Sequence, residues 1–360
     1  MTEESFLVVR LGSMGDIVHT LPAVAALRRR YPQARIDWLV ETRWQELVRL
    51  NPHITHCIPV DTLGWRRRLF SSATWRTIVQ ELGALRRGRY DYALDFQGLY
   101  KSAVLAWLAA APQRLGFHEQ FLREPGCFVF YTERVVPPPF GATHVIELNL
   151  ALVARLEAEP QRPLVFDLVT TPEDETYVED QLRAHGLDEF FILSPGGGWE
   201  SKCWPVERYA ELHDTLVQQR SWRGVINVGP GEELLAAAIE RLAGAAKPMR
   251  LATRPRQFIA LARRARLVIS GDTGPLHLAA VLGTPVVGLY GPTDPVRNGP
   301  YGARVAVVYN PGVAPVTYKH ARGYSPAMLS ISVEQVLTAV ERLTVTAMQS
   351  KPAGLASSNA

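Results

Sequence analysis

The sequence predicts an α/β protein made of two Rossmann-like halves, each with a parallel sheet covered by helices. Strand-like and helix-like segments alternate in both halves, and a proline-rich stretch over residues 157–172 separates the two series. With 360 residues and 47% hydrophobic content, the chain is long enough to bury two cores. We therefore expect an N-terminal domain over residues 1–165 and a C-terminal domain over residues 166–330.

In the first half, short apolar runs alternate with segments that have apolar residues at helical spacing. Strands are expected at residues 6–9, 35–41, 57–61 and 90–96, and helices at 17–30, near 44–50 and at 101–111. This alternation predicts a parallel sheet with helices on its faces.

The second half repeats the alternation. Strands are expected at residues 190–195, 224–229, 266–272 and 285–291, and helices at 206–219, 233–244, 255–265 and 275–282. Residues 331–346 predict a last amphipathic helix that packs back on the N-terminal domain, and residues 347–360 have the composition of a disordered tail. A ligand is expected in a cleft at the carboxyl ends of the strands.

The composition excludes several classes of protein. No apolar stretch reaches the roughly 18 residues that a membrane span needs, and MTEESF is no secretory leader, which predicts a cytoplasmic protein. Cys57, Cys127 and Cys203 are far apart and not at metal-ligand spacing, so neither a disulfide framework nor a zinc site is indicated.

The net charge of +4 decides little, but the basic residues are unevenly placed. Residues 64–90 hold three consecutive arginines among aromatic residues: Trp65, Arg66, Arg67, Arg68, Phe70 and Trp75. Such a surface can bind phosphate, carboxylate, an anionic membrane or nucleic acid, and the alternative is a solvated basic helix face. Only five of the 39 basic residues are lysine, which marks Lys101 and Lys202 as less expected choices.

Asp16 lies at the turn between the first strand and the first helix. Its carboxylate can cap the helix by accepting backbone N–H groups. The cap does not explain the glycines at positions 12 and 15, which allow a sharp turn and the close approach of a ligand. Cap and catalytic carboxylate both remain open from the local pattern.

Three strand ends of the second half carry unusual loops. The first loop has Gly196, Gly197 and Gly198, whose N–H groups can line an anion that Lys202 neutralises, although the P-loop spacing is absent. The second has Glu232 and Glu233 at a helix start. A carboxylate there can bind ribose hydroxyls or serve only as a favourable helix charge.

The third loop runs from Asp272 through Thr273 and Gly274 into a helix with Pro275 in its first turn. Free N–H groups at such a helix start suit a diphosphate, and His277 can reach the same anion or be structural. Because all three loops are expected at one sheet edge, they predict a nucleotide-diphosphate site. Leu234 stands where a dinucleotide fingerprint needs its third glycine, which argues against an NAD enzyme.

Together, the motifs resemble one known family. SMGDIVHTLPA, KCWPVERYAEL, SGDTGPLHLAA and YGPTDP, in order over about residues 6–300, are similar to the ADP-heptose:lipopolysaccharide heptosyltransferases, which are inverting GT-B glycosyltransferases. WRRR with FSSATW, DFQGLYKSA and LREP are most like heptosyltransferase I, which adds the first heptose to Kdo-lipid A.

The resemblance implies roles for particular residues. The catalytic carboxylate falls on Asp16, the lysine of K-x-W-P on Lys202, and the ribose-binding glutamate on Glu232. The implied donor-binding residues are Gly197, Gly198, Lys202, Glu232, Thr253, Asp272, Thr273, Gly274 and His277. Gly197 and Gly198 stand where heptosyltransferase I has hydroxyl-bearing residues, so phosphate contacts there would be made by the backbone.

The resemblance also implies a mechanism and partners. Asp16 would face Lys202 and the Asp272 loop across the cleft and accept the proton of the attacking hydroxyl. Lys202 and the helix start at Thr273 would stabilise the leaving diphosphate without a metal, since the sequence has no Asp-x-Asp pair, and no cofactor is expected. The acceptor would be an acidic lipid at the cytoplasmic face of the inner membrane, bound by Arg66, Arg67, Arg68, Lys101 and Arg123.

Other functions stay open at this point. A relative with another sugar donor or a later core acceptor would carry the same motifs. A sugar-nucleotide-modifying enzyme such as an epimerase would share the two halves without transferring a sugar. A membrane-docking or nucleic-acid-binding protein would use only the arginine-rich surface. We expect a monomer with an ADP-sugar donor and no nucleic-acid partner.

Overall fold

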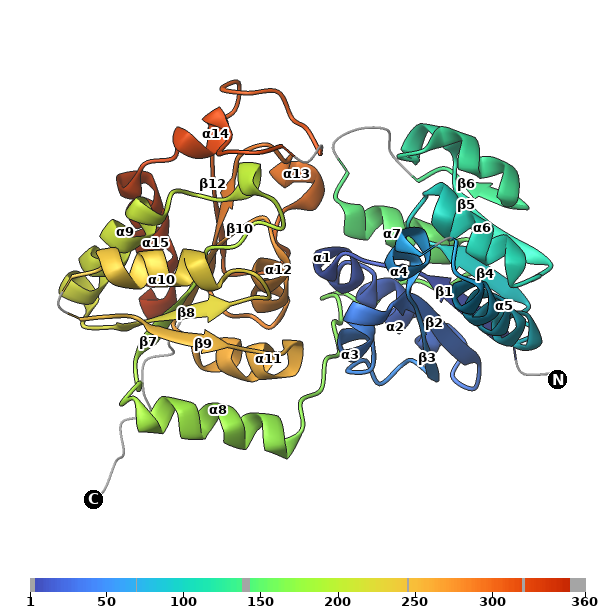
Figure 1. Ribbon diagram of the computed structural model, residues 1–360, viewed down its shortest axis with the longest axis horizontal. Helices are drawn as coiled ribbons and strands as arrows, with labels where there is room; N and C mark the ends of the chain where they lie inside the picture. Colours follow the sequence, from blue (N-terminus) through green and yellow to red (C-terminus); the bar gives the residue numbers. More distant parts are fainter. Residues whose placement is uncertain (1–3, 69, 138–142, 245, 319–320, 350–360) are drawn as a thin grey trace, which may run out of the picture. The chain divides into compact units, whose positions relative to one another are not determined.

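The computed structural model describes residues 4–68, 70–137, 143–244, 246–318 and 321–349. The chain divides into two compact units, Met1–Thr171 and Pro172–Ala360 (Figure 1). Each unit has one six-stranded sheet, with the order β3-β2-β1-β4-β5-β6 in the first and β12-β11-β10-β7-β8-β9 in the second. The paired strands are parallel in both sheets. The predicted pair of parallel-sheet α/β halves is confirmed.

The first unit places β1 at the centre of its sheet. Its strands are β1 Ser5–Val9, β2 Arg35–Glu41, β3 His56–Val60, β4 Tyr92–Asp95, β5 Gln113–Phe117 and β6 Glu133–Val135. Its helices are α1 Met14–Val18, α2 Leu21–Arg30, α3 Gln45–Val48, α4 Thr62–Arg67, α5 Ser72–Arg87, α6 Tyr100–Leu108 and α7 Val145–Ala154, with short 3-10 helices at Thr42–Trp44, Glu119–Phe121 and Pro125–Phe130. α2 packs with α7, and α5 packs with α6.

The segment expected to be one helix over residues 17–30 is two helices, α1 and α2. The break falls at Thr20, whose Oγ1 donates to the Asp16 carbonyl oxygen at 2.8 Å. Pro22 lies in the first turn of α2, where its missing N–H costs nothing. The short α1 therefore ends two residues after Asp16, which lies in its first turn.

The second unit repeats the arrangement. Its strands are β7 Phe190–Ser194, β8 Arg223–Val228, β9 Met249–Ala252, β10 Leu267–Gly271, β11 Val286–Tyr290 and β12 Val305–Tyr309. Its helices are α8 Pro172–Ala184, α9 Val206–Arg220, α10 Glu233–Leu242, α11 Pro255–Arg264, α12 Gly274–Val281, α13 Pro295–Asn298, α14 Pro326–Leu329 and α15 Val333–Gln349, with a 3-10 helix at Glu200–Lys202. α9 packs with α10 and α15. α9 and α10 contact β8, and α15 contacts β11 and β12. α11 packs with α8 and α12.

The last helix of the chain packs within the second unit. The packing of residues 331–346 on the N-terminal domain stays a prediction, and the contacts of α15 are with α9, β11 and β12 of the second unit. Val336 and Val340 are buried in the core of that unit, and Trp204 Nε1 donates to the Ile331 carbonyl oxygen at 3.0 Å. The helix also continues to Gln349, so the predicted tail starts later than residue 347, and residues 350–360 lie outside the described residues.

The boundary between the units lies after Thr171, six residues beyond the expected one. Residues before it are held by the first unit. Asn51 Nδ2 donates to the Asp167 carbonyl oxygen and Val169 N donates to the Leu50 carbonyl oxygen, both at 3.0 Å. The proline-rich stretch is therefore hydrogen-bonded to the first unit and is not a free linker between the two units.

Two features concern the membrane and the cysteines. Among the residues that the structure describes, no helix is both long enough and apolar enough to span a bilayer. Cys57, Cys127 and Cys203 are free thiols, the last two buried.

Candidate active site

Four strands of the second unit bring the predicted donor-binding residues to one sheet edge. β10, β7, β8 and β9 are neighbours in the sheet and run parallel, so their carboxyl ends lie side by side. The loops that follow carry, in this spatial order, Asp272 to Gly274, Gly197 to Lys202, Glu232, and Thr253. The carboxyl ends of parallel strands are where open α/β sheets bind ligands.

Lys202, Asp272 and His277 form a buried cluster at this edge. Lys202 Nζ lies 2.7 Å from Asp272 Oδ2, and His277 Nε2 lies 3.0 Å from Asp272 Oδ1. Burial alone would raise the pKa of the Asp272 carboxyl, but the neighbouring Lys202 and His277 outweigh burial and hold it far below its usual range. Asp272 is therefore a carboxylate that fixes both side chains.

The Lys202 ammonium keeps donors for a further anion. Its Nζ also lies 4.5 Å from the centre of the Trp199 ring, and this cation–π contact helps to position the ammonium group. An ammonium has three N–H donors, and Asp272 takes one of them. Lys202 is thus a positioned cation at the strand edge.

The helix α12 begins directly beside this cluster. Thr273 is its N-cap residue, and Pro275 lies in the first turn. The Thr273 hydroxyl lies 2.8 Å from the Ser270 hydroxyl, which ties the loop to the end of β10. Free N–H groups in the first turn of a helix attract anions. The start of α12 therefore adds to the positive potential that Lys202 supplies.

The glycine-rich loop after β7 has little room for side chains. A Cβ on Gly197 would lie 2.8 Å from the Trp199 carbonyl oxygen and 2.9 Å from Cys203 Sγ, and Gly198 has a φ of +75°. Burial, together with the nearby carboxylates, raises the pKa of the Cys203 thiol to about 11, so this thiol stays protonated and serves to pack the loop. Gly197 is buried in this loop, whereas Gly198 is exposed.

Glu232 and Thr253 lie in the loops that follow β8 and β9. Glu232 Oε2 accepts from Gly229 N at 2.9 Å, and a Cβ on Gly196 would collide with its carboxylate. Burial is the main cause that raises the pKa of Glu232. Thr253 Oγ1 donates to Asn227 Oδ1 at 2.7 Å. Asn227, buried on β8, was missed in the sequence because a single polar residue in GVINVG gives no local signal.

Asp16 lies at the corresponding edge of the first unit. It is the third residue of α1 and accepts from the N-cap residue Ser13, at 2.7 Å from its N and 3.0 Å from its Oγ. Its other oxygen pairs with the Arg10 guanidinium. Burial would raise the pKa of Asp16, but the Arg10 charge and the hydrogen bonds from Ser13 outweigh burial and lower it. Asp16 is therefore the partner of Ser13 in a capping box, with Ser13 rather than Asp16 as the N-cap residue.

Arg10, which was not singled out in the sequence, and the loop after β4, which belongs to the motif DFQGLYKSA, hold the Asp16 turn in place. The Arg10 guanidinium also donates to the Phe96 carbonyl oxygen, and Leu11 N donates to Gln97 Oε1 at 2.7 Å. Fully buried Asp95 shapes that loop by accepting from Gln97 N at 2.9 Å and from Tyr131 OH at 2.7 Å. The available signal for Arg10 was a charged residue at the end of an apolar strand.

The predicted acceptor-binding residues belong to three neighbouring segments of the first unit. Lys101 Nζ lies 3.6 Å from Glu41 Oε1, and Glu41 also accepts from Thr62 at the start of α4. Glu124, next to Arg123, accepts from Tyr100 N at 2.6 Å at the start of α6. Arg66, Arg67, Arg68 and Arg123 are exposed. The structure thus brings Lys101 near both segments but leaves the arginines on the surface.

The fold is a GT-B-type α/β arrangement of two parallel-sheet units, and the candidate site lies at the strand ends of the second unit. Residues 79–320 match the family described as glycosyltransferase family 9 (heptosyltransferase). The chain therefore belongs to this family and is a glycosyltransferase.

Similar proteins cover most of the chain. Lipopolysaccharide heptosyltransferase 1 of Pseudomonas aeruginosa is 31% identical over 315 residues, which are 82% of this chain and 81% of that protein. The solved structure of E. coli heptosyltransferase WaaC with ADP has a TM-score of 0.73 and 26% identity, covering 94% and 99% of the two chains. The same enzyme with ADP-2-deoxy-2-fluoro heptose has a TM-score of 0.72 and 27% identity, with the same coverage.

Proposed function

We propose that this enzyme transfers a heptose from ADP-heptose to a Kdo-lipid A type acceptor in the synthesis of the lipopolysaccharide inner core. The family, the similarity to heptosyltransferase 1 and the ADP-containing relatives support this donor and this acceptor class. The observation that carries the proposal is the cluster of Lys202, Asp272 and His277 beside the start of α12.

The donor diphosphate is held by the second unit. Lys202 and the first turn of α12 face the growing negative charge of the leaving ADP, which is the charge that an inverting transfer must stabilise. Asp272 positions Lys202 and His277 and does not itself contact the diphosphate, since both of its oxygens are engaged. Backbone N–H groups at Gly197 and Gly198 contact the phosphates, while Glu232 and Thr253 contact the nucleoside.

Asp16 takes the proton in this proposal. The acceptor hydroxyl oxygen forms a bond to the anomeric carbon as the bond from that carbon to the diphosphate oxygen breaks, and ADP leaves with the electron pair. The hydroxyl proton passes to the Asp16 carboxylate. The side chain of Asp16 is 36% exposed, which leaves room for a hydroxyl beside the bonds to Ser13 and Arg10.

The acceptor is an acidic lipid headgroup at the cytoplasmic face of the membrane. Arg66, Arg67, Arg68 and Arg123 present guanidinium groups that pair well with phosphate and carboxylate. Lys101 contributes through the same region, where Glu41 holds it.

Transfer can be tested with purified protein, ADP-heptose and Kdo-lipid A, with the product followed by mass spectrometry. We expect one heptose to be added per acceptor with release of ADP, and turnover to survive EDTA because Lys202 and α12 supply the positive charge. Isomerised or hydrolysed donor without glycosylated acceptor would contradict the proposed transfer. A requirement for added Mg²⁺ or Mn²⁺ would contradict the role given to Lys202.

A further inference from the structure

The outer surface of α5 is unusually apolar for a helix in contact with water. Only Ile78 and Leu85 are buried along this 16-residue helix. Trp75 and Val79 are 54% and 66% exposed, and Phe70, in the turn before the helix, is fully exposed. Large apolar side chains that remain in water at neighbouring positions mark a site of interaction.

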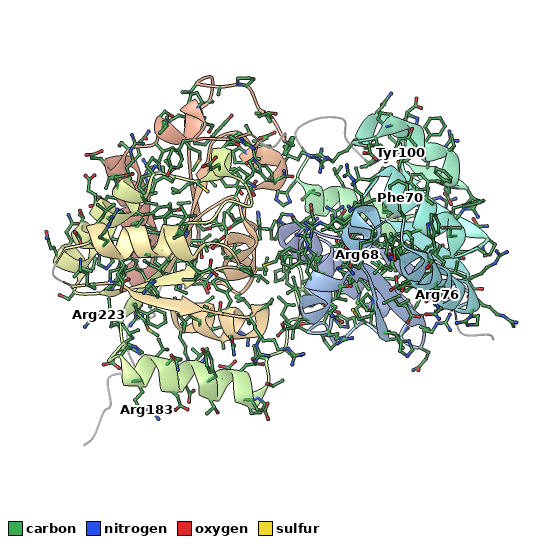
Figure 2. The ribbon with its side chains drawn as sticks, in the orientation of Figure 1. Arg68, Phe70, Arg76, Tyr100, Arg183 and Arg223 are labelled. Carbon is green, nitrogen blue, oxygen red and sulfur yellow. The ribbon has the colours of Figure 1, made fainter. Side chains whose placement is uncertain are left out.

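These side chains share one face. Trp75 and Val79 are four residues apart and lie one above the other, and Arg86, eleven residues after Trp75, falls on the same stripe. Arg76 lies on the adjacent stripe. Figure 2 shows the side chains of Arg68, Phe70 and Arg76 on the first unit, beside α4 and α5.

The charge around this face is strongly positive. Residues 62–87 contain six arginines and a single acidic residue, Glu81. Glu81 is only partly exposed, whereas all six arginines are exposed. The combination of exposed aromatic residues with arginines fits the interface of an anionic bilayer.

Trp65 shows that the aromatic residues of this region have different roles. It is partly buried and packs against the core of the first unit with Ile58 and Leu82. The sequence grouped Trp65 with Phe70, but the structure separates an inward anchor of α4 from an outward side chain. The outward set is Phe70, Trp75 and Val79.

We propose that the α5 surface, defined as Phe70, Trp75, Val79, Arg76 and Arg86, docks this enzyme onto an anionic lipid bilayer. The three apolar side chains enter the headgroup region while the two arginines pair with lipid phosphates. The inference deepens the proposed function and rests on it for the presence of a membrane. It assigns docking to residues other than those proposed to bind the acceptor headgroup.

The test uses the full chain and vesicles that contain neither donor nor acceptor. Vesicles of phosphatidylethanolamine with phosphatidylglycerol are compared by co-sedimentation with vesicles of phosphatidylcholine alone. We expect the wild type to bind the anionic vesicles and to lose binding as salt rises. Phe70→Ser/Trp75→Ser/Val79→Ser should weaken binding about tenfold or more, because the apolar area that enters the interface is lost.

Two further variants separate the contributions. Arg76→Gln/Arg86→Gln should weaken binding roughly tenfold and reduce its salt dependence, since each basic residue near the surface contributes separately. Leu234→Ser removes an exposed apolar side chain from α10 of the second unit and should bind as the wild type does. Wild-type binding by the triple variant, or no binding of the wild type to anionic vesicles, would overturn the inference.

Two controls keep the outcomes distinct. The triple variant should transfer heptose to a short-chain, soluble acceptor headgroup at the wild-type rate, because its changes lie outside the proposed catalytic and acceptor residues. If the wild type failed to transfer heptose in that assay, the proposed function would be rejected. The result of the vesicle binding assay would still stand. RNA provides a second comparison. If RNA competed with the vesicles for the wild type, and if the triple variant lost RNA binding as strongly as vesicle binding, the surface would be assigned to nucleic acid instead.

Discussion

At the scale of single residues, the helix cap at Asp16 is compatible with the proton acceptance that we propose for it, although the sequence presented the two as alternatives. Ser13 and Arg10 occupy one oxygen each of its carboxylate, and the bonds with Ser13 make Asp16 part of a capping box. The same bonds keep it ionised and fixed in orientation, which is what a proton acceptor needs. A cap therefore does not argue against catalysis here.

Replacing Asp16 by asparagine should separate these roles. We expect Asp16→Asn to lower kcat by about 10²- to 10⁴-fold, because the amide keeps the shape and loses the basicity. The binding of ADP, measured by calorimetry, should stay close to the wild-type value, since the proposed donor residues belong to the second unit. The control Ser13→Ala removes one bond of the cap while leaving the carboxylate, and should lower thermal stability more than kcat. A near-normal rate for Asp16→Asn would leave Asp16 as a cap only.

The Arg10 guanidinium should set the pH range over which Asp16 works. Its charge helps to hold the pKa of Asp16 below the ordinary value of about 3.9. The wild-type rate should therefore stay level as pH falls until it passes below that range. In Arg10→Met the burial of Asp16 is no longer offset by Arg10, so its pKa rises and the acid limb of the kcat/KM profile moves to higher pH.

The conservative variant distinguishes this effect from a folding defect. Arg10→Lys keeps the charge and should keep the acid limb near its wild-type position, even where the rate falls. The free energy of unfolding follows the same sign. Because the pKa of Asp16 is lowered in the folded state, ionised Asp16 stabilises the fold at pH values above its unfolded-state pKa. This stabilisation is lost as the pH falls through the folded-state pKa. An unchanged acid limb in Arg10→Met would show that Asp16 is not the group that limits the rate.

At the scale of elements, the ion pair between Lys202 and Asp272 joins the loop after β7 to the loop after β10. Removing one partner leaves the other charge buried, which is costly, whereas removing both leaves none. Lys202→Met should therefore lower both the melting temperature and kcat, the latter by about 10²- to 10³-fold for the loss of charge stabilisation. Lys202→Met/Asp272→Asn should recover melting temperature but not kcat.

The two readouts decide between structure and chemistry. Calorimetric unfolding measures the loss of stability caused by an unpaired buried charge. Single-turnover transfer measures the loss of rate when the leaving diphosphate is less well stabilised. If the double variant regained activity along with stability, Lys202 would be only a structural partner of Asp272. If Lys202→Met left the rate unchanged, the leaving diphosphate would be stabilised by other groups.

The elements show where local pattern succeeds and where it stops. The strands that carry the donor loops were predicted because their apolar runs end in glycine-rich turns, as in LVISGDTG. The break at Thr20 was missed because it depends on a hydrogen bond and a proline inside one continuous helical pattern. The site residues Asn227 and Arg10 were missed because each acts through a contact from another segment.

At the scale of the whole molecule, the two parallel sheets were predictable because alternation and length depend on the sequence alone. The position of α15 was not, since an amphipathic helix shows that it has an apolar face but not which core that face completes. Tertiary contacts decide this: Trp204 and Arg208 both donate to the Ile331 carbonyl oxygen just before the helix. The last helix therefore belongs to the second unit.

This assignment makes a prediction for unfolding. Each unit has its own hydrophobic core, so differential scanning calorimetry should resolve two transitions. Val336→Ala removes a fully buried side chain of α15 and should lower one transition through a loss of about 1 to 3 kcal/mol. ADP at about 100 times its Kd should raise the same transition, by about 2.7 kcal/mol of stabilisation, and leave the other in place. If ADP raised the transition that Val336→Ala leaves unchanged, or if both changes acted on one common transition, α15 and the donor site would not form a separately folding unit.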